Sequence, residues 1–209
     1  MLNAKKLTLA VLVQAALIST AYASEQSEAK GFVEDAEGTV LFRTGYLSRD
    51  KKNGVDDTSS AAQTAIINLD SGFTKGIVGF GAGIIGDASF KLGKNGHTGN
   101  QMIPTHSQDN ADGTKDAYDH WARGGAYVKA RVSNTTAKYG TQVSEIPVIA
   151  SNTARLTPEY YTGLYIESNE IKDLTLIGGK FTKNQWSNHI SSDQQGLDSA
   201  RSEERRVGK

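Results

Sequence analysis

Hydrophobic and polar residues alternate along most of the chain after residue 24, and this pattern predicts β-strands. The clearest case is Gly76–Leu92, where most even positions are apolar and most odd positions are small or polar. The same alternation predicts further strands at Val40–Tyr46, Ala126–Val132, Gln63–Asp70, Thr136–Gly140, Gly163–Ser168 and Leu174–Lys183. No segment after residue 24 keeps the apolar spacing of a long helix. We therefore expect an all-β fold of about seven strands.

The predicted connections between these strands alternate in length. Short turns are expected at Asp70-Ser71-Gly72, Ser133-Asn134-Thr135 and Asn169–Asp173. Long polar loops are expected at 50–60, 93–119, 141–160 and from residue 184 onward. Short turns at one end of a sheet and long loops at the other are typical of outer-membrane barrels. The sequence therefore predicts a transmembrane antiparallel β-barrel, whose apolar face meets lipid and whose polar face meets water.

The two ends of the chain differ from the rest. Lys5 and Lys6 precede an apolar run, and Ala21-Tyr22-Ala23 fits a small-residue cleavage site, so residues 1–23 are predicted to be a cleaved signal peptide. Residues 201–209 resemble the translation of a sequencing adapter, so they are predicted to be a non-native tail, the alternative being a genuine charged tail. Residues 24–200 are then the truncated N-terminal part of a barrel.

Composition narrows the possible functions. The 209-residue chain has no cysteine, which excludes disulfide scaffolds and cysteine nucleophiles. Residues 24–200 hold 17 basic and 21 acidic residues, which argues against a nucleic-acid partner. His97, His106, His120 and His189 lack metal-ligand spacing. We therefore predict neither an enzyme nor a bound metal or cofactor.

One glycine motif has two interpretations. Gly81-x-Gly83-x-x-Gly86 fits a dinucleotide-binding fingerprint, but the alternating pattern continues after it where that fingerprint requires a helix. We favour the second interpretation, in which small residues let side chains or loops approach the polar face of a strand.

Several short motifs, in the same order along the chain, are similar to segments of the OprD-type porin family. The likeness covers nearly all of residues 24–185, and its main segments are Ser27–Asp35, Leu47–Asp50, Asp70–Gly81, Arg123–Ala126, Lys129–Ser133, Lys138–Gly140, Ser151–Pro158 and Gly179–Thr182. This resemblance implies a barrel of about eighteen strands in the outer membrane, usually trimeric. It also implies passage of small solutes that carry a carboxylate, including basic amino acids.

The residues alone leave a second hypothesis open, a secreted or periplasmic β-rich binding or adhesion module. The apolar face distinguishes the two hypotheses. A soluble module must cover that face with a second sheet, whereas a barrel leaves it to lipid.

The resemblance also suggests which residues guide the solute. Arg49, at the end of the first strand, and Arg155, in the third loop, match arginines that line the family's channel. Guanidinium groups suit this role because they stay charged and offer a planar fork to carboxylate. The polar face could extend the row through Arg43, Lys91, Lys129 and Arg131, and Tyr160 could frame the waist. The alternatives are loop salt bridges for Arg49 and Arg155, solvated lumen charge for the other four, and an interfacial aromatic position for Tyr160.

Overall fold

The computed structural model describes residues 24–52, 54, 56–93, 100–106, 115–146 and 149–194. The predicted signal peptide and the predicted tail lie outside the described residues. Within the described ranges, no helix is long and apolar enough to cross a membrane.

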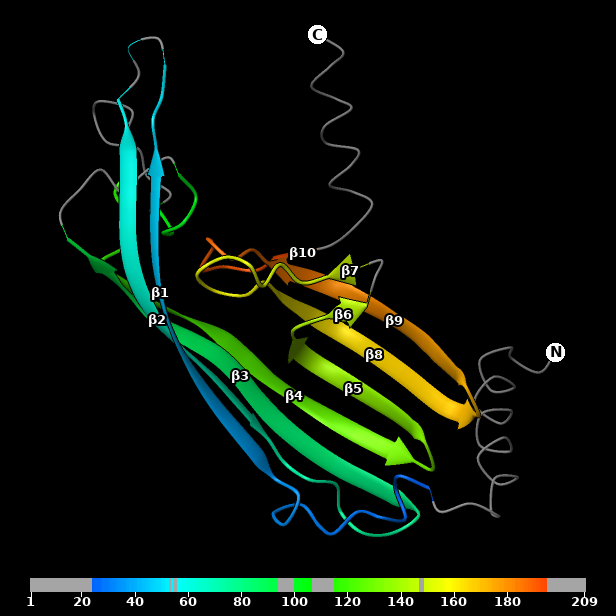
Figure 1. Ribbon diagram of the computed structural model, residues 1–209. Coiled ribbons are helices and arrows are strands. Elements are labelled where there is room, and N and C mark those ends of the chain that lie inside the picture. The colour runs from blue at the N-terminus through cyan, green and yellow to red at the C-terminus, as the bar shows by residue number, and fades with distance from the viewer. Residues whose placement is uncertain are drawn as a thin grey trace, which may run out of the picture.

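The described residues form one curled antiparallel sheet with the strand order β1-β2-β3-β4-β5-β8-β9-β10 (Figure 1). Each strand except the short β10 corresponds to one predicted strand, so the all-β prediction is confirmed. The strands of the sheet are β1 (Glu37–Arg49), β2 (Thr58–Asp70), β3 (Val78–Leu92), β4 (His120–Val132), β5 (Thr135–Gln142), β8 (Tyr160–Ile171), β9 (Leu174–Gln185) and β10 (Asp193–Gln194). A separate hairpin of β6 (Glu145–Ile146) and β7 (Ile149–Ala150) lies inside the predicted loop 141–160.

Two of the three predicted short turns are confirmed. Ser133 and Asn134 join β4 to β5, and Lys172 and Asp173 join β8 to β9. Ser133 and Asp173 have positive φ values of 53° and 61°, which let two residues reverse the chain between twisted strands.

The predicted turn at Asp70-Ser71-Gly72 is wrong in length, because the connection between β2 and β3 spans residues 71–77. It is longer because it folds back against β3 instead of reversing at once. The Ser71 N–H donates to the Ala82 carbonyl at 2.9 Å, and the Thr74 N–H donates to the Phe80 carbonyl at 2.9 Å.

The burial of the two faces is the reverse of that in a soluble protein. On β3, Phe80 and Ile84 are 59% and 50% exposed, whereas Asp87 is 4% exposed. On β4, Val128 is 58% exposed and its neighbour Lys129 only 8%. In the described part of the chain, the only other sheet is the two-residue hairpin, so no second sheet covers the apolar face. This arrangement fits a wall in lipid and contradicts the soluble binding module.

A small apolar core lies where the long-loop segments pack on the sheet. Ala62 of β2 and Trp121 of β4 pack with Ile103 and Leu156, which come from two different loops. This core holds the loop segments near the long-loop ends of the strands.

The glycines of β3 provide room for other groups on the polar face. A Cβ on Gly79 would lie 2.2 Å from the Gln26 side chain, one on Gly81 2.6 Å from Lys129, and one on Gly83 2.3 Å from Tyr127. The small residues thus let side chains and the neighbouring connection approach the strand. The second interpretation of the glycine motif is confirmed, and the dinucleotide fingerprint is wrong.

We expect Gly83→Ala to destabilise the full-length protein by about 1–3 kcal/mol, the usual cost of overpacking. Its Cβ would lie 2.3 Å from the Tyr127 ring and 2.7 Å from the Leu69 carbonyl oxygen, and a backbone oxygen cannot easily move aside. Gly178→Ala on β9 is the matched control, since no heavy atom of the described residues lies within 4 Å of its Cβ. The measurement is the temperature at which the folded band is lost in gel electrophoresis. Equal shifts for both variants would contradict the steric argument.

The N-terminal strap, which we define as residues 24–36, crosses the short-turn end of the sheet (dark blue in Figure 1). Its Gln26 is only 3% exposed. The Gln26 backbone N–H donates to the Ser133 carbonyl at 3.1 Å, and its side-chain Nε2 donates to the Thr74 and Gly76 carbonyls at 3.0 and 3.1 Å. The strap therefore ties together two connections that are distant in sequence.

Candidate functional site: the third loop and the polar wall

The third loop, residues 143–159, joins β5 to β8 and lies against the polar face. Its outer part, Asn152 to Arg155, is exposed, whereas Leu156 to Glu159 are buried. The loop is also tied to itself, because the Ser151 N–H donates to the Ser144 carbonyl at 2.7 Å. The loop is thus a structured element with one face toward the wall and the other toward open space.

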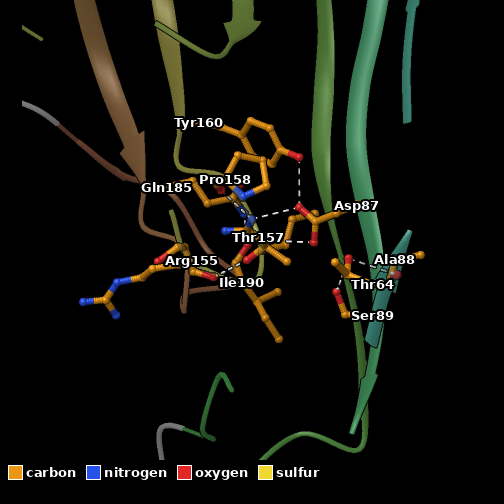
Figure 2. Close-up of polar contacts among 12 residues, drawn as sticks. Thr64, Asp87, Ala88, Ser89, Arg155, Thr157, Pro158, Tyr160, Gln185 and Ile190 are labelled. Atoms are coloured by element: carbon orange, nitrogen blue, oxygen red, sulfur yellow. Dashed lines mark hydrogen bonds and ion pairs between the residues drawn. The ribbon is translucent and has the colours of Figure 1, made fainter. Parts of the chain in front are cut away.

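A buried polar cluster holds the wall side of this loop. Asp87 of β3 and Arg123 of β4 face each other in register and form an ion pair with Nη2 and Oδ2 2.8 Å apart. The Tyr160 hydroxyl donates to the same Asp87 oxygen at 2.9 Å. Figure 2 shows this hydroxyl directed at Asp87. Because its hydroxyl is bonded to Asp87 and its side chain is buried, Tyr160 supports the third loop from beneath.

Arg43 and Arg155 meet on the other side of the loop. Arg43, on β1, donates through Nη1 to the carbonyls of Thr153 and Arg155. The Arg155 side chain extends away from Asp87 and Tyr160 (Figure 2) and donates through Nη1 to the Gln101 carbonyl at 3.0 Å. The structure therefore places the Arg43 guanidinium against the backbone of Arg155, although more than a hundred residues separate the two in the sequence.

Lys129 and Arg131 lie near the short-turn end of β4, and both are paired. Lys129 Nζ is 2.7 Å from Asp70 Oδ1. Arg131 Nη1 is 3.7 Å from Glu25 Oε2, and its Nε donates to Gln26 Oε1 at 3.1 Å. The ring of Phe73 lies within 4.4 Å of both cationic groups. These contacts neutralise the predicted cationic row at the short-turn end of the sheet.

Lys91 and Arg49 lie at the long-loop end of the sheet. Lys91 Nζ is 2.5 Å from Asp119 Oδ1. The hydrogen bond from Lys91, together with its charge, lowers the pKa of the Asp119 carboxyl. Arg49 ends β1 and is exposed. The seven predicted residues thus form three groups along the wall, at the third loop, at the short-turn end and at the long-loop end.

Sequence reasoning missed Asp87 and Arg123 as members of the site. Their alternating positions place both on a polar face, but only the strand register shows that they are opposite each other. It also missed a polar cavity of about 370 Å³ beside the start of the third loop, whose lining includes Tyr127, Lys138, Glu145, Tyr165 and Glu167. The Lys138 ammonium lies 4.5 Å from the centre of the Tyr127 ring there. Across the residues that the structure describes, no group of acidic or histidine side chains could hold a metal ion.

Comparison with known proteins decides the family. The profile described as "outer membrane porin, OprD family" matches residues 30–207. The chain belongs to the OprD family of outer membrane porins. Its relatives are channels and not enzymes, and they reside in the outer membrane.

Three relatives show the extent of the likeness. Porin D of Pseudomonas aeruginosa is 36% identical over 176 residues, which cover 84% of this chain and 38% of that protein. The crystal structure of Acinetobacter baumannii OccAB1 is 64% identical with a TM-score of 0.74, over 81% of this chain and 39% of that one. The crystal structure of Pseudomonas aeruginosa OpdK with vanillate is 30% identical with a TM-score of 0.64, over 78% of this chain and 40% of that one.

The porin chain spans about two fifths of the length of these relatives. Seven long strands out of about eighteen is the same fraction, so strand count and coverage agree. In this family the polar face is the lumen wall, and the apolar face meets the lipid of the outer membrane.

Proposed function

We propose that the full-length protein is a substrate-selective porin for passive diffusion of small solutes that carry a carboxylate, such as basic amino acids. The main supporting observation is that the third loop carries the exposed Arg155 and that the Arg43 guanidinium binds the backbone of the same loop. The relative OpdK was solved with vanillate, which is a carboxylate, and this supports the same solute class.

The proposed mechanism is electrostatic. A narrow waist excludes bulk water, so an anion there needs fixed positive charge to replace its hydration. Arg49, exposed near the long-loop end, would capture the carboxylate first, and Arg155 with Arg43 would guide it past the third loop. Tyr160, buried beneath the third loop, would frame the waist only indirectly, by supporting that loop from the wall. Lys91, Lys129 and Arg131 would act more weakly, because each already has an acidic partner.

The proposed partners other than the solute are lipid and further copies of the chain. Phe42, Tyr46 and Phe80 are 70%, 69% and 59% exposed on the apolar face, as contact with acyl chains would require. The homotrimer of the full-length protein stays a prediction. Light scattering of the purified full-length protein in detergent measures its mass, and a monomeric mass would contradict the trimer.

We expect Arg155→Ala in the full-length protein to slow uptake of small carboxylates several-fold, because it removes a positive fork from the waist. Neutral solutes of similar size should pass as fast or faster, because alanine is smaller. Arg155→Lys should take up carboxylates faster than Arg155→Ala but more slowly than the unmodified protein, since ammonium keeps the charge but loses the two-pronged geometry. Uptake into liposomes and single-channel conductance would be compared for each solute.

The matched control is Lys172→Ala, which removes one exposed positive charge in the β8–β9 turn, away from the third loop. It should leave the preference for carboxylates unchanged. If Arg155→Ala slowed neutral and anionic solutes equally, Arg155 would be shaping the third loop and the guidance role would be wrong.

A further inference from the structure

The Asp87–Arg123 ion pair is sealed from solvent although it faces a water-filled lumen. Both side chains are 0% exposed. Arg123 binds the carboxylate through two nitrogens, with Nε at 3.3 Å from Oδ1 and Nη2 at 2.8 Å from Oδ2. Its guanidinium also lies 5.1 Å from the centre of the Tyr160 ring. Burying two charges costs several kcal/mol before their attraction is counted, so a wall that needed only polarity would not require this pair.

The same guanidinium binds two loops. Its Nη2 donates to the Pro158 carbonyl of the third loop at 2.7 Å. Its Nη1 donates to the Trp186 carbonyl, in the chain that follows β9, at 2.7 Å. Arginine alone among the side chains carries five donors in one rigid plane, so it can reach a carboxylate and two separate carbonyls at once. The cluster is therefore a junction between the wall and two loops.

The two loops also bind each other beside this junction. The Thr157 hydroxyl donates to the Ser187 carbonyl at 2.6 Å. Asn184, at the end of β9, donates through Nδ2 to Glu159 Oε1 at 2.6 Å. All four residues are buried. A shift of the third loop away from the wall would thus have to break contacts with the chain that follows β9.

We propose that Arg123, held by Asp87, is a positioning residue that fixes the third loop and the segment Trp186–Ile190 at a set distance from the lumen wall and so sets the size limit of the channel. This inference rests on the proposed function as a diffusion pore. It separates two tasks: Arg155 and Arg43 act on the charge of a solute, and Arg123 acts on its permitted size. Arg123 itself touches no solute, because it is sealed beneath the loop.

The experiment uses two variants of the full-length protein. Arg123→Lys keeps the charge beside Asp87 but loses the planar fork that reaches both carbonyls. The double variant Arg123→Met/Asp87→Leu removes both charges together, so that neither is left buried without a partner. The matched control is Ser89→Ala. Ser89 lies on the same face of β3 as Asp87, and its hydroxyl donates a buried hydrogen bond of 2.8 Å to Thr64 of β2 (Figure 2). The hydrogen bonds of these two side chains among the described residues run to each other and to the Ala88 carbonyl, and none reaches the described part of the third loop.

The readouts are liposome swelling with neutral sugars of increasing size, open-channel current noise, and the reversal potential in a salt gradient. We expect the rate for a disaccharide relative to a pentose to rise several-fold in both variants, with greater noise. The reversal potential should keep its sign, because Arg155 and Arg43 remain. Ser89→Ala should match the unmodified protein in all three readouts.

Two results would overturn the proposal. One is a folded Arg123→Met/Asp87→Leu protein with unchanged sugar ratio and noise. The other is failure of both variants to form a folded barrel, which would assign the pair to wall assembly instead of loop position. Failure of the proposed function is a separate result, since it would appear as no charge preference in the unmodified protein.

Discussion

Asp87→Asn should lower the free energy of unfolding of the full-length protein by about 3–5 kcal/mol, the usual cost of leaving a buried charge without its partner. Asparagine keeps the shape of the side chain but not its charge, and Arg123 would stay sealed in the wall with both side chains at 0% exposure. The variant would also weaken the acceptor for the Tyr160 hydroxyl. The measurement is denaturant unfolding in detergent, followed by intrinsic fluorescence.

Two comparisons test the reason for this loss. The double variant Arg123→Met/Asp87→Leu should recover much of the stability, because it removes the unpaired charge. Asp119→Asn should have little effect on stability. The Asp119 side chain, which pairs with Lys91, is 77% exposed, so water can solvate the Lys91 ammonium that is left without a partner. An Asp87→Asn protein as stable as the unmodified one would show that water reaches the cluster.

A polypeptide of residues 24–200 alone should yield no heat-resistant barrel and no conductance steps in a bilayer. The described sheet begins at β1 and ends at the two-residue β10, so β1 and most of β9 each have an edge without a strand partner. Each unpaired backbone group costs several kcal/mol in lipid, and an open edge has no strand partner whose hydrogen bonds would offset this cost. Gel electrophoresis with and without heating, and planar bilayer recording, would measure this, with the full-length protein as the positive control. A monomeric, cooperative, pore-forming fragment would contradict it.

The strands could be predicted from the sequence because lipid and water impose a strict period of two on a wall one sheet thick. The alternation around Val78 to Leu92 is visible without any knowledge of the partner strands. The length of the β2–β3 connection could not be predicted, because residues 71–77 take their shape from hydrogen bonds to Phe80 and Ala82 across the sheet. The β6–β7 hairpin is two residues per strand, which is too short to produce a periodic signal.

The site was less accessible to sequence reasoning because its contacts join distant segments. Arg43 and Arg155 could each be assigned to a face or a loop, but their meeting depends on how the third loop folds. Lys129 and Arg131 were predicted as members of an open cationic row. Their acidic partners, Asp70 and Glu25, come from another strand and from the strap, so the sequence spacing gives no sign of the pairing.

The reversed burial of the two faces has a consequence for how this wall can vary. Val128 and Phe80 contact a fluid that adapts to any apolar shape, so exchange among aliphatic and aromatic residues there changes little besides contact area with acyl chains. Gly83 and Asp87, on the opposite face, are surrounded by fixed atoms that tolerate neither extra volume nor lost charge. Natural drift should therefore accumulate fastest at the most hydrophobic positions of each strand and slowest at the small and charged ones. That ordering is the opposite of the one a water-soluble domain imposes on its core.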